Sequence, residues 1–405
     1  MLVLLSEIVI TQVPTTDFKD RNSSFTMNFV TECELSSSWA NLTDTAKLKF
    51  PKNIYFSDQT GKQVSWEGKN IAGSSTTPPL VMRGDKITIS LGYQYPVANP
   101  NPNAVDTLVQ EMNTEFTGYI TKITPSMPIE MECEDNMYRL KQVQAPNKQY
   151  NGSVQDMLKD MFANAKIADI TINSDSTISL GKSFTTNSET IAQVLNRLQK
   201  DYQIESYFRG NELRCSDIVY YGDAIQSVFA FQENIIKDDL EYRRLDDFKM
   251  GITAKSVSEV QSATSTRKDG TPKMDKQQLS VFVTKDVKGN IITPAEGSFE
   301  GENRSLYFFS VTNLSDLTKK AGNKLNRLYY EGFYGSFTSF GLPFVKHGDD
   351  VLIRDRVLPE RNGTYKAKKV TVTFGEKGFR RKIDLDIRVD TIPKDQLTST
   401  GQFIG

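Results

Sequence analysis

The sequence contains few of the side chains on which enzyme active sites usually depend. His347 is its single histidine, so a Ser-His-Asp arrangement would have to use that residue. The Walker A, GxGxxG, HExxH and EF-hand patterns are all missing, which removes the common phosphate, dinucleotide and metal sites. Together these absences favour a protein that is not an enzyme and that needs no cofactor or metal.

Cysteine is also scarce. Cys33, Cys133 and Cys215 are odd in number and show no C-x-x-C spacing, so the sequence predicts neither a disulfide framework nor a zinc site. Cys33 and Cys133 each alternate with acidic residues, as small residues on the inner face of a strand do. We therefore expect these two cysteines in the core.

Long hydrophobic runs and an excess of one charge are missing as well. No apolar run reaches the ~18 residues that a membrane-spanning helix needs. The opening MLVLLSEIVITQV lacks a basic start and meets Glu7 early, so it predicts a first strand and not a signal peptide. The 49 basic and 50 acidic residues nearly cancel, which disfavours a nucleic-acid binder. We expect a soluble protein, made in the cytosol, without a membrane anchor or a sequence-specific nucleic-acid partner.

The sequence contains one short pattern twice. Val81–Ile89 reads VMRGDKITI and Val345–Ile353 reads VKHGDDVLI, with Val, Gly, Asp and the final Ile in common. In each copy a Gly-Asp turn precedes an alternating strand, and glycine at such a turn permits a positive φ. His347 stands where the first copy has Arg83, so it occupies a polar turn position. The paired turn residues are Gly84, Asp85, Gly348 and Asp349.

The likeness continues after each turn. TGYITKI and IEMECED follow the first copy, while GTYKAKKVTV and KIDLDIRV follow the second, and a Pro- or Gly-marked turn separates each pair of alternating strands. Similarity in a fixed order is typical of internal duplication, although two antiparallel domains can also look alike by chance. We expect a β-rich α+β protein in which two similar antiparallel β-barrel modules flank a small α/β insertion module.

A change of pattern places the insertion in the middle of the chain. Thr186 and Glu189 fit a capping box in front of a helix whose apolar residues recur at i, i+3, i+4 and i+7. Two polar, turn-rich stretches later in the chain predict mobile loops. The expected boundaries are 1–148 for the first barrel, 149–222 for the insertion, 223–392 for the second barrel with loops 256–276 and 286–303, and 393–405 for a C-terminal tail.

The module order and two strings resemble a known family. SSSWANLTDTAKLKFPKN and FGLPFVKHGDDVLIRD are similar to segments of the phage tail baseplate hub, or late control D, family and of the N-terminal half of VgrG spike proteins. The resemblance implies a structural homotrimer at the virion tail tip. It implies that six similar barrels in a ring join the hexameric tail tube, or a distal tail protein, to a trimeric spike or fibre. Because the sequence stops at Gly405, we expect the spike to be a separate protein.

The two copies carry opposite charge. Residues 105–135 hold seven acidic residues and one basic, and residues 344–382 hold eleven basic and five acidic. Unlike modules side by side in a ring would attract, so this asymmetry predicts their order. The alternatives are two solvated faces, or a basic barrel facing the tube. The predicted interface residues are Arg380, Arg381, Lys382, Glu130, Glu132 and Glu134.

Two other function classes stay open at this point. A carbohydrate- or surface-binding β-sandwich protein would need an aromatic-lined groove. A carboxylate-dependent glycan or cell-wall hydrolase would need two acids, for which Asp349-Asp350 and Asp246-Asp247 are candidates by adjacency alone. Trp39 is expected to fill the end of a barrel, with ligand stacking as the alternative.

Overall fold

The computed structural model confirms a β-rich fold with large antiparallel sheets. None of the sheets formed by the described residues closes on itself, so the barrel form is not confirmed, and we write of a first and a second β module. The structure describes residues 2–51, 55–58, 60–65, 79–97, 107–124, 128–174, 180, 184–216, 225–266, 272–294, 299–308 and 311–389. Within 258–276 only the backbone of these residues is described.

The first β module alternates apolar and polar residues along its strands. In β9, Ile129, Met131 and Cys133 are buried while the glutamates between them are not. Each fully buried side chain of this size contributes about 1.5–3 kcal/mol to folding. The strands are β1 (Val3–Thr11), β2 (Ser24–Met27), β3 (Glu32–Ser38), β4 (Thr45–Phe50), β5 (Tyr55–Ser57), β6 (Gln63–Ser65), β7 (Lys86–Val97), β8 (Thr107–Thr124) and β9 (Ile129–Glu134).

The second β module repeats the strand order of the first. Pairing runs β3-β4-β9-β8-β7-β1 in the first module and β16-β21-β24-β23-β22-β15 in the second, and the chain visits the matching strands in the same sequence. One difference is that β1 pairs antiparallel with β7, whereas β15 pairs parallel with β22. The strands are β15 (Gln226–Ala230), β16 (Ile235–Arg243), β21 (Gly332–Phe340), β22 (Asp350–Arg354), β23 (Gly363–Gly375) and β24 (Arg380–Arg388), with a 3-10 turn, η1 (Pro359–Arg361), before β23.

The duplicated turns also match in their hydrogen bonds. Gly84 and Gly348 have φ values of +94° and +86°. Their amides donate to the carbonyls of Ile120 on β8 and Ala367 on β23, at 2.8 and 2.7 Å. Ile120 and Ala367 in turn donate to the carbonyls of the aspartates that follow the glycines. Six matching strands and two matching turns therefore support an internal duplication.

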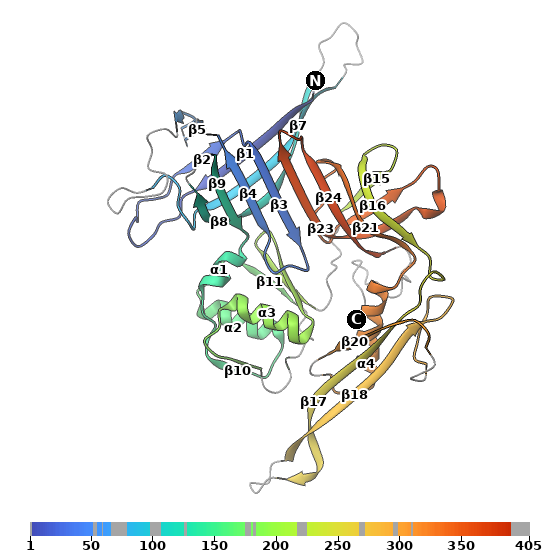
Figure 1. The fold of residues 1–405 in the computed structure, drawn as a ribbon. Helices are drawn as coiled ribbons and strands as arrows, with labels where there is room; N and C mark the ends of the chain where they lie inside the picture. The colour runs from blue at the N-terminus through green and yellow to red at the C-terminus, as the bar shows by residue number, and fades with distance from the viewer. Residues whose placement is uncertain are drawn as a thin grey trace.

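The two modules form one continuous sheet (Figure 1). β3 pairs antiparallel with β23, in a register that runs from Lys369 opposite Ser38 to Gly375 opposite Glu32. The buried apolar residues of both modules also belong to one cluster. The modules are therefore packed as a single body.

The insertion module has its own core beneath the first β module (Figure 1). Its helix α3 buries the predicted stripe, but the N-cap is Thr190, which forms a capping box with Gln193. The predicted cap, Thr186, is instead the buried last residue of β12. Its hydroxyl donates to the Pro146 carbonyl and so does not cap the helix. The elements are α1 (Met137–Gln142), β10 (Lys148–Tyr150), α2 (Val154–Asn164), β11 (Thr171–Ser174), β12 (Phe184–Thr186), α3 (Ile191–Tyr202), β13 (Glu205–Arg209) and β14 (Glu212–Ser216).

A further unit, the arm, extends from the second β module between β16 and β21. Most of the loop predicted at 256–276 is strand, since β17 and β18 form a long hairpin there. The hairpin is polar, so its sequence shows little of the hydrophobic alternation that predicts a strand. The predicted loop 286–303 holds a turn and the short β19, and its residues 295–298 lie outside the described residues. The predicted tail 393–405 also lies outside the described residues. The arm comprises β17 (Met250–Thr266), β18 (Pro272–Lys285), β19 (Ile291–Ile292), β20 (Glu302–Tyr307) and α4 (Leu314–Leu328), around its own apolar cluster.

The matching turns predict matching substitution effects. Gly84→Ala and Gly348→Ala should each lower the unfolding free energy by about 1 kcal/mol, because positive φ disfavours a side chain. Nothing lies closer than 3.6 Å to a Cβ built at either position, so conformation alone sets the cost. Thermal unfolding of both variants measures it. Gly152→Ala, at an open position without positive φ, is the control, and a Gly348→Ala variant as stable as that control would contradict the equivalence.

Candidate functional site at the junction between the two β modules

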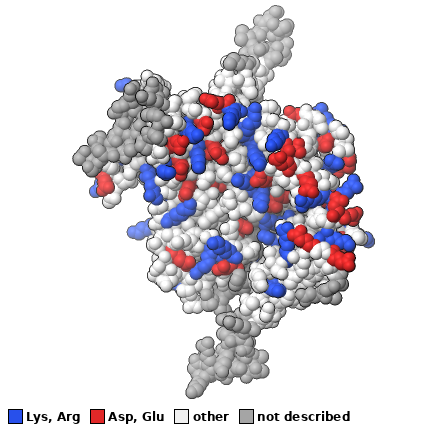
Figure 2. All heavy atoms as spheres, in the orientation of Figure 1, with Lys and Arg blue, Asp and Glu red and all other residues white. Residues whose placement is uncertain are grey.

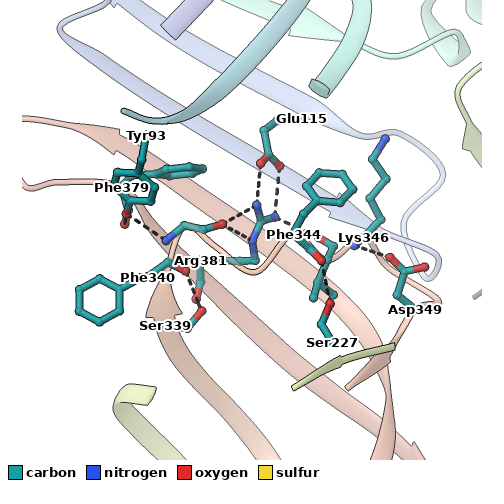
Figure 3. Close-up of polar contacts among 12 residues, drawn as sticks. Tyr93, Glu115, Ser227, Ser339, Phe340, Phe344, Lys346, Asp349, Phe379 and Arg381 are labelled. Atoms are coloured by element: carbon teal, nitrogen blue, oxygen red, sulfur yellow. Dashed lines mark hydrogen bonds and ion pairs between the residues drawn. The ribbon is translucent and has the colours of Figure 1, made fainter. Parts of the chain in front are cut away.

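The junction is held by one buried ion pair between the modules (Figure 3). Arg381, near the start of β24, is 0% exposed, and the Glu115 side chain on β8 is 3% exposed. Two guanidinium nitrogens donate to the two carboxylate oxygens of Glu115, at 2.6 and 3.1 Å. Such a bidentate pair fixes the orientation of both groups as well as their distance.

Arg381 also organises the loop that enters the second duplicated turn. Its guanidinium donates to the carbonyls of Gly341, at 2.9 and 3.1 Å, and of Val345, at 3.0 Å. These bonds satisfy the remaining donors, which a buried guanidinium requires. Burial raises the pKa of Glu115, and the charge of Arg381 opposes that rise. One side chain therefore connects β8, the loop and β24.

Aromatic side chains surround this pair. Tyr93 on β7 donates its hydroxyl to the Phe379 carbonyl at 2.9 Å and accepts from the Gly341 amide at 3.3 Å. The rings of Tyr93 and Phe379 lie 5.3 Å apart, and the Arg381 guanidinium lies 5.3 Å from the Phe344 ring centre. The hairpin of β7 and β8 is thereby fixed to the second module by apolar, polar and ionic contacts together.

The other predicted interface residues lie on the surfaces of β9 and β24. Glu132 pairs with Lys122 at 3.6 Å and Glu134 with Lys141 at 2.7 Å, both within the first half of the chain. Glu130, Lys382 and Arg380 lie on the same strands, with Glu130 and Lys382 exposed. The Arg380 guanidinium lies 5.1 Å from the Phe340 ring centre. Of the six, only Arg381 is buried between modules, and it is bound within its own chain.

The two turn aspartates accept equivalent sets of hydrogen bonds. Asp85 accepts from the amides of Met82 and Val13 and pairs with Arg21 at 2.7 Å. Asp349 accepts from the amides of Lys346 and Ile225 and pairs with Arg209 at 2.6 Å. Both aspartates are at most 1% exposed. These ion pairs stabilise the two turns. Because Arg209 belongs to β13, its pair with Asp349 also attaches the insertion module to the second β module.

His347 is buried beside the Asp44 carboxylate where three modules meet. Its Nδ1 lies 3.9 Å from Asp44 Oδ2, and its ring meets Tyr207 of β13 edge to face at 5.0 Å. Neither ring nitrogen has a hydrogen-bond partner among the described residues. Burial, with nearby Arg209, lowers the pKa of His347 to about 3, so the ring is neutral. Its setting is that of a packed side chain.

Asp44 lies in the turn between β3 and β4, and Asp135 follows β9, where the chain leaves the first module. The Asp44 amide donates to Asp135 Oδ2 at 3.2 Å, and the Ser38 amide donates to Asp44 Oδ1 at 2.9 Å. Burial raises the pKa of Asp135 to about 7 and that of Asp44 well above its usual value. The folded protein therefore holds protons here that the unfolded chain releases.

Trp39 is buried at the far end of the junction. It is 3% exposed, and the guanidinium of Arg327, on α4 of the arm, lies 4.3 Å from its ring centre. The amine of Lys368 lies 5.9 Å from the ring centre. The burial of Trp39 agrees with the prediction that its side chain fills space in the core. The space lies between modules, however, and not at the end of a barrel.

Charges on the surface are interspersed. In Figure 2, blue and red side chains alternate over the visible face without one large area of a single sign. No three His, Cys, Asp or Glu side chains among the described residues form a group that could hold a metal ion. Within that part of the chain, no helix has the length and apolar content to cross a membrane.

Comparison with known structures finds the same fold in other proteins. The chain has the fold of phage tail proteins, as the sequence resemblance indicated. A tail protein from Neisseria meningitidis MC58 matches with a TM-score of 0.55 and 12% identity over 94% of this chain and 96% of that one. The 43 kDa tail protein of prophage MuSo2 from Shewanella oneidensis matches with a TM-score of 0.52 and 13% identity, over 94% and 97%. No protein-family model and no curated protein sequence matches the chain.

The buried pair predicts a large, non-additive loss of stability. Arg381→Met should lower the unfolding free energy by about 3–5 kcal/mol, because it leaves Glu115 buried without its partner. Glu115→Gln should cost less, since Arg381 keeps its carbonyl acceptors. Urea unfolding of both single variants and the double variant measures the coupling. Arg380→Met is the matched control with little expected effect, and additive losses in the double variant would contradict the pair's role.

The carboxylate cluster predicts a dependence on pH. Because the folded-state pKa values of Asp44 and Asp135 are raised, stability should fall as pH rises from about 4 to about 7. Asp44→Asn keeps an oxygen for the Ser38 amide and presents an N–H towards His347 Nδ1. It should stabilise the protein at pH 8 by on the order of 1 kcal/mol, and less at pH 4–5.

The control is a carboxylate with the opposite shift. Hydrogen bonds from Asn290 lower the pKa of Asp286, so Asp286→Asn should lose stability at high pH. Thermal unfolding across the pH range compares the variants. An Asp44→Asn variant less stable than the parent at pH 8 would show that the ionised carboxylate is favourable here.

Proposed function

We propose that the protein is the structural, non-enzymatic hub of a phage or phage-derived tail tip. In this proposal it is a homotrimeric symmetry adaptor that joins the hexameric tail tube, or a distal tail protein, to a trimeric spike or fibre. The observation that carries it is the internal duplication of a six-strand module around one edge-to-edge junction. Two modules per chain match a sixfold partner when three chains assemble.

The duplication leaves one half of a further junction without a partner strand in each β module, among the described strands. Within the chain, the edge of β3 pairs with residues 369–375 of β23. The equivalent of β3 is β16, which pairs only with β21 among the described strands. The equivalent of that part of β23 begins at Lys122–Thr124 of β8, which pairs only with β9 in the same described set. A second chain can therefore supply each missing partner.

The registers specify how two chains would meet. Ile120 and Ala367 hold equivalent places, since each precedes a one-residue bulge before the pairing continues. Counted from Ile120 and Ala367, the residue pairs of neighbouring strands in one module correspond to those in the other. This correspondence makes Glu241 the equivalent of Ser36, and Thr124 the equivalent of Thr371. Because Ser36 lies opposite Thr371 within the chain, Glu241 should lie opposite Thr124 of the next chain.

Repeating this contact is a head-to-tail association that closes into a ring when the rotation allows it. In such a ring first and second modules alternate, as the in-chain junction already places them. The predicted charges fit this order: Arg381 with Glu115 joins unlike modules within a chain, and we propose that Arg380, Lys382 and the glutamates of β9 favour the same order between chains. Exposed pairs contribute only about 0.2–1 kcal/mol each, so they would act mainly on assembly rate and order.

The two sides of the sheet would meet different partners. In Figure 1 the insertion module and the arm lie on one side of the continuous sheet, and the hairpin of β7 and β8 projects from the opposite side. We propose that the hairpin side faces the tube and that the insertion and arm side faces the spike or fibre. The protein would then act at the virion tail tip after synthesis in the host cytoplasm.

The proposed contact predicts a specific cross-link. A chain carrying Glu241→Cys and Thr124→Cys should form disulfides between chains under mild oxidation, and the product should be a covalent trimer on a denaturing gel. Cross-strand partners have Cα atoms about 4.5–5.5 Å apart, which suits a disulfide.

A matched control tests the geometry itself. Ser36→Cys with Thr371→Cys places the same pair at the in-chain junction and should give a disulfide within one chain. Glu241→Cys alone should give no ladder of covalent products. If the in-chain control closes while the Glu241 and Thr124 variant stays monomeric at high concentration, the ring contact is wrong.

A further inference from the structure

Three strands of the first β module have no counterpart in the second. β2 lies between β1 and β3 in the chain, whereas only a short turn joins β15 to β16. β5 and β6 lie between β4 and β7, while no strand lies between β21 and β22. These three strands pair with one another at the outer edge of β1. Neither the junction nor the duplicated module requires this extension, so a role of its own is expected.

The extension has two faces of different character. Phe25 and Phe56 point inward, with ring centres 5.0 Å apart and an edge-to-face angle of 73°. The alternate positions Thr26, Tyr55 and Ser57 point to the other face. The inner face explains how the extension is held.

The outer face forms a cleft of about 320 Å³. Phe29 and Tyr55 are 58% and 62% exposed, which is unusual for two aromatic side chains at one small cleft. Gln63 Nε2 donates to Ser57 Oγ at 2.9 Å, which orients the amide. The residues that line the cleft are Thr26, Asn28, Phe29, Pro51, Tyr55, Ser57 and Gln63.

None of the described residues that line the cleft is charged, in a chain of which 24% is Asp, Glu, Lys or Arg. Among these described residues an anionic or cationic ligand would find no counter-charge. A purely apolar ligand would desolvate two amides, of Asn28 and Gln63, and three hydroxyls, of Thr26, Tyr55 and Ser57, at a cost of about 1–3 kcal/mol for each polar group left unsatisfied. A ligand that offers both C–H faces and hydroxyl groups suits all of them.

We propose that this cleft binds a neutral oligosaccharide. Phe29 and Tyr55 would pack against the C–H faces of sugar rings, and Asn28, Ser57 and Gln63 would exchange hydrogen bonds with ring hydroxyls. Four of the lining residues, Thr26, Tyr55, Ser57 and Gln63, lie on the extension strands β2, β5 and β6, and Phe29 lies three residues before β3. None of the lining residues belongs to the paired segments of β3 and β23, so sugar binding does not require assembly through the junction.

Titration of the full chain with cellotetraose, maltotetraose, chitotetraose and mannotetraose tests the proposal. Saturation-transfer NMR and calorimetry should detect at least one of them with a Kd on the order of 0.1–1 mM. Phe29→Ala and Tyr55→Ala should each weaken that binding about tenfold, since each removes one packing surface. Tyr307→Ala, at a tyrosine 58% exposed on β20, is the matched control and should leave binding unchanged.

The outcomes are distinct from those of the ring proposal. Both aromatic variants should keep the thermal midpoint of the parent and should cross-link through Glu241→Cys and Thr124→Cys as the parent does. No binding of any of the four sugars would overturn the proposal. Binding that survives both Phe29→Ala and Tyr55→Ala would also overturn it, because the sugar would then occupy another place.

Discussion

The pairing of β3 with β23, fixed by the buried contact of Arg381 with Glu115, is the constraint on which the rest of the structure depends. Without it the two modules would be separate sheets connected by the insertion. A buried ion pair is weak as a source of stability but strict about geometry, because neither charge tolerates the loss of its partner. It therefore sets the angle between the modules and, with it, the curvature of any ring built from them.

The insertion module shares this rigidity through a second set of contacts. Arg209 binds Asp349 at the second duplicated turn, and Asn136 donates to the Gly210 carbonyl at 3.0 Å across the entry to the module. Tyr207 of the insertion module packs on His347 of the second β module. Asp44, in the turn between β3 and β4, lies beside His347 and donates its amide to the carboxylate of Asp135, just after β9. The insertion module is thus tied to the junction between the two β modules.

The sequence predicted the duplication because its clearest trace, Gly-Asp before an alternating strand, is set by local backbone needs: positive φ at Gly84 and Gly348 and an aspartate that accepts nearby amides. It did not predict that Glu115 meets Arg381, since residues 266 positions apart leave no local pattern. Only the opposite charge of the two segments pointed that way, and it was interpreted as a contact between chains. The long hairpin of the arm was missed for a related reason, since a polar two-stranded hairpin shows little hydrophobic periodicity.

The central claim is that the in-chain junction repeats between chains and closes after three. Light scattering of the purified protein, alone and beside its tail tube protein, measures this most directly. The account predicts a species three times the 45.7 kDa mass of one chain. A protein that keeps the mass of a single chain at every concentration and in both conditions would contradict it.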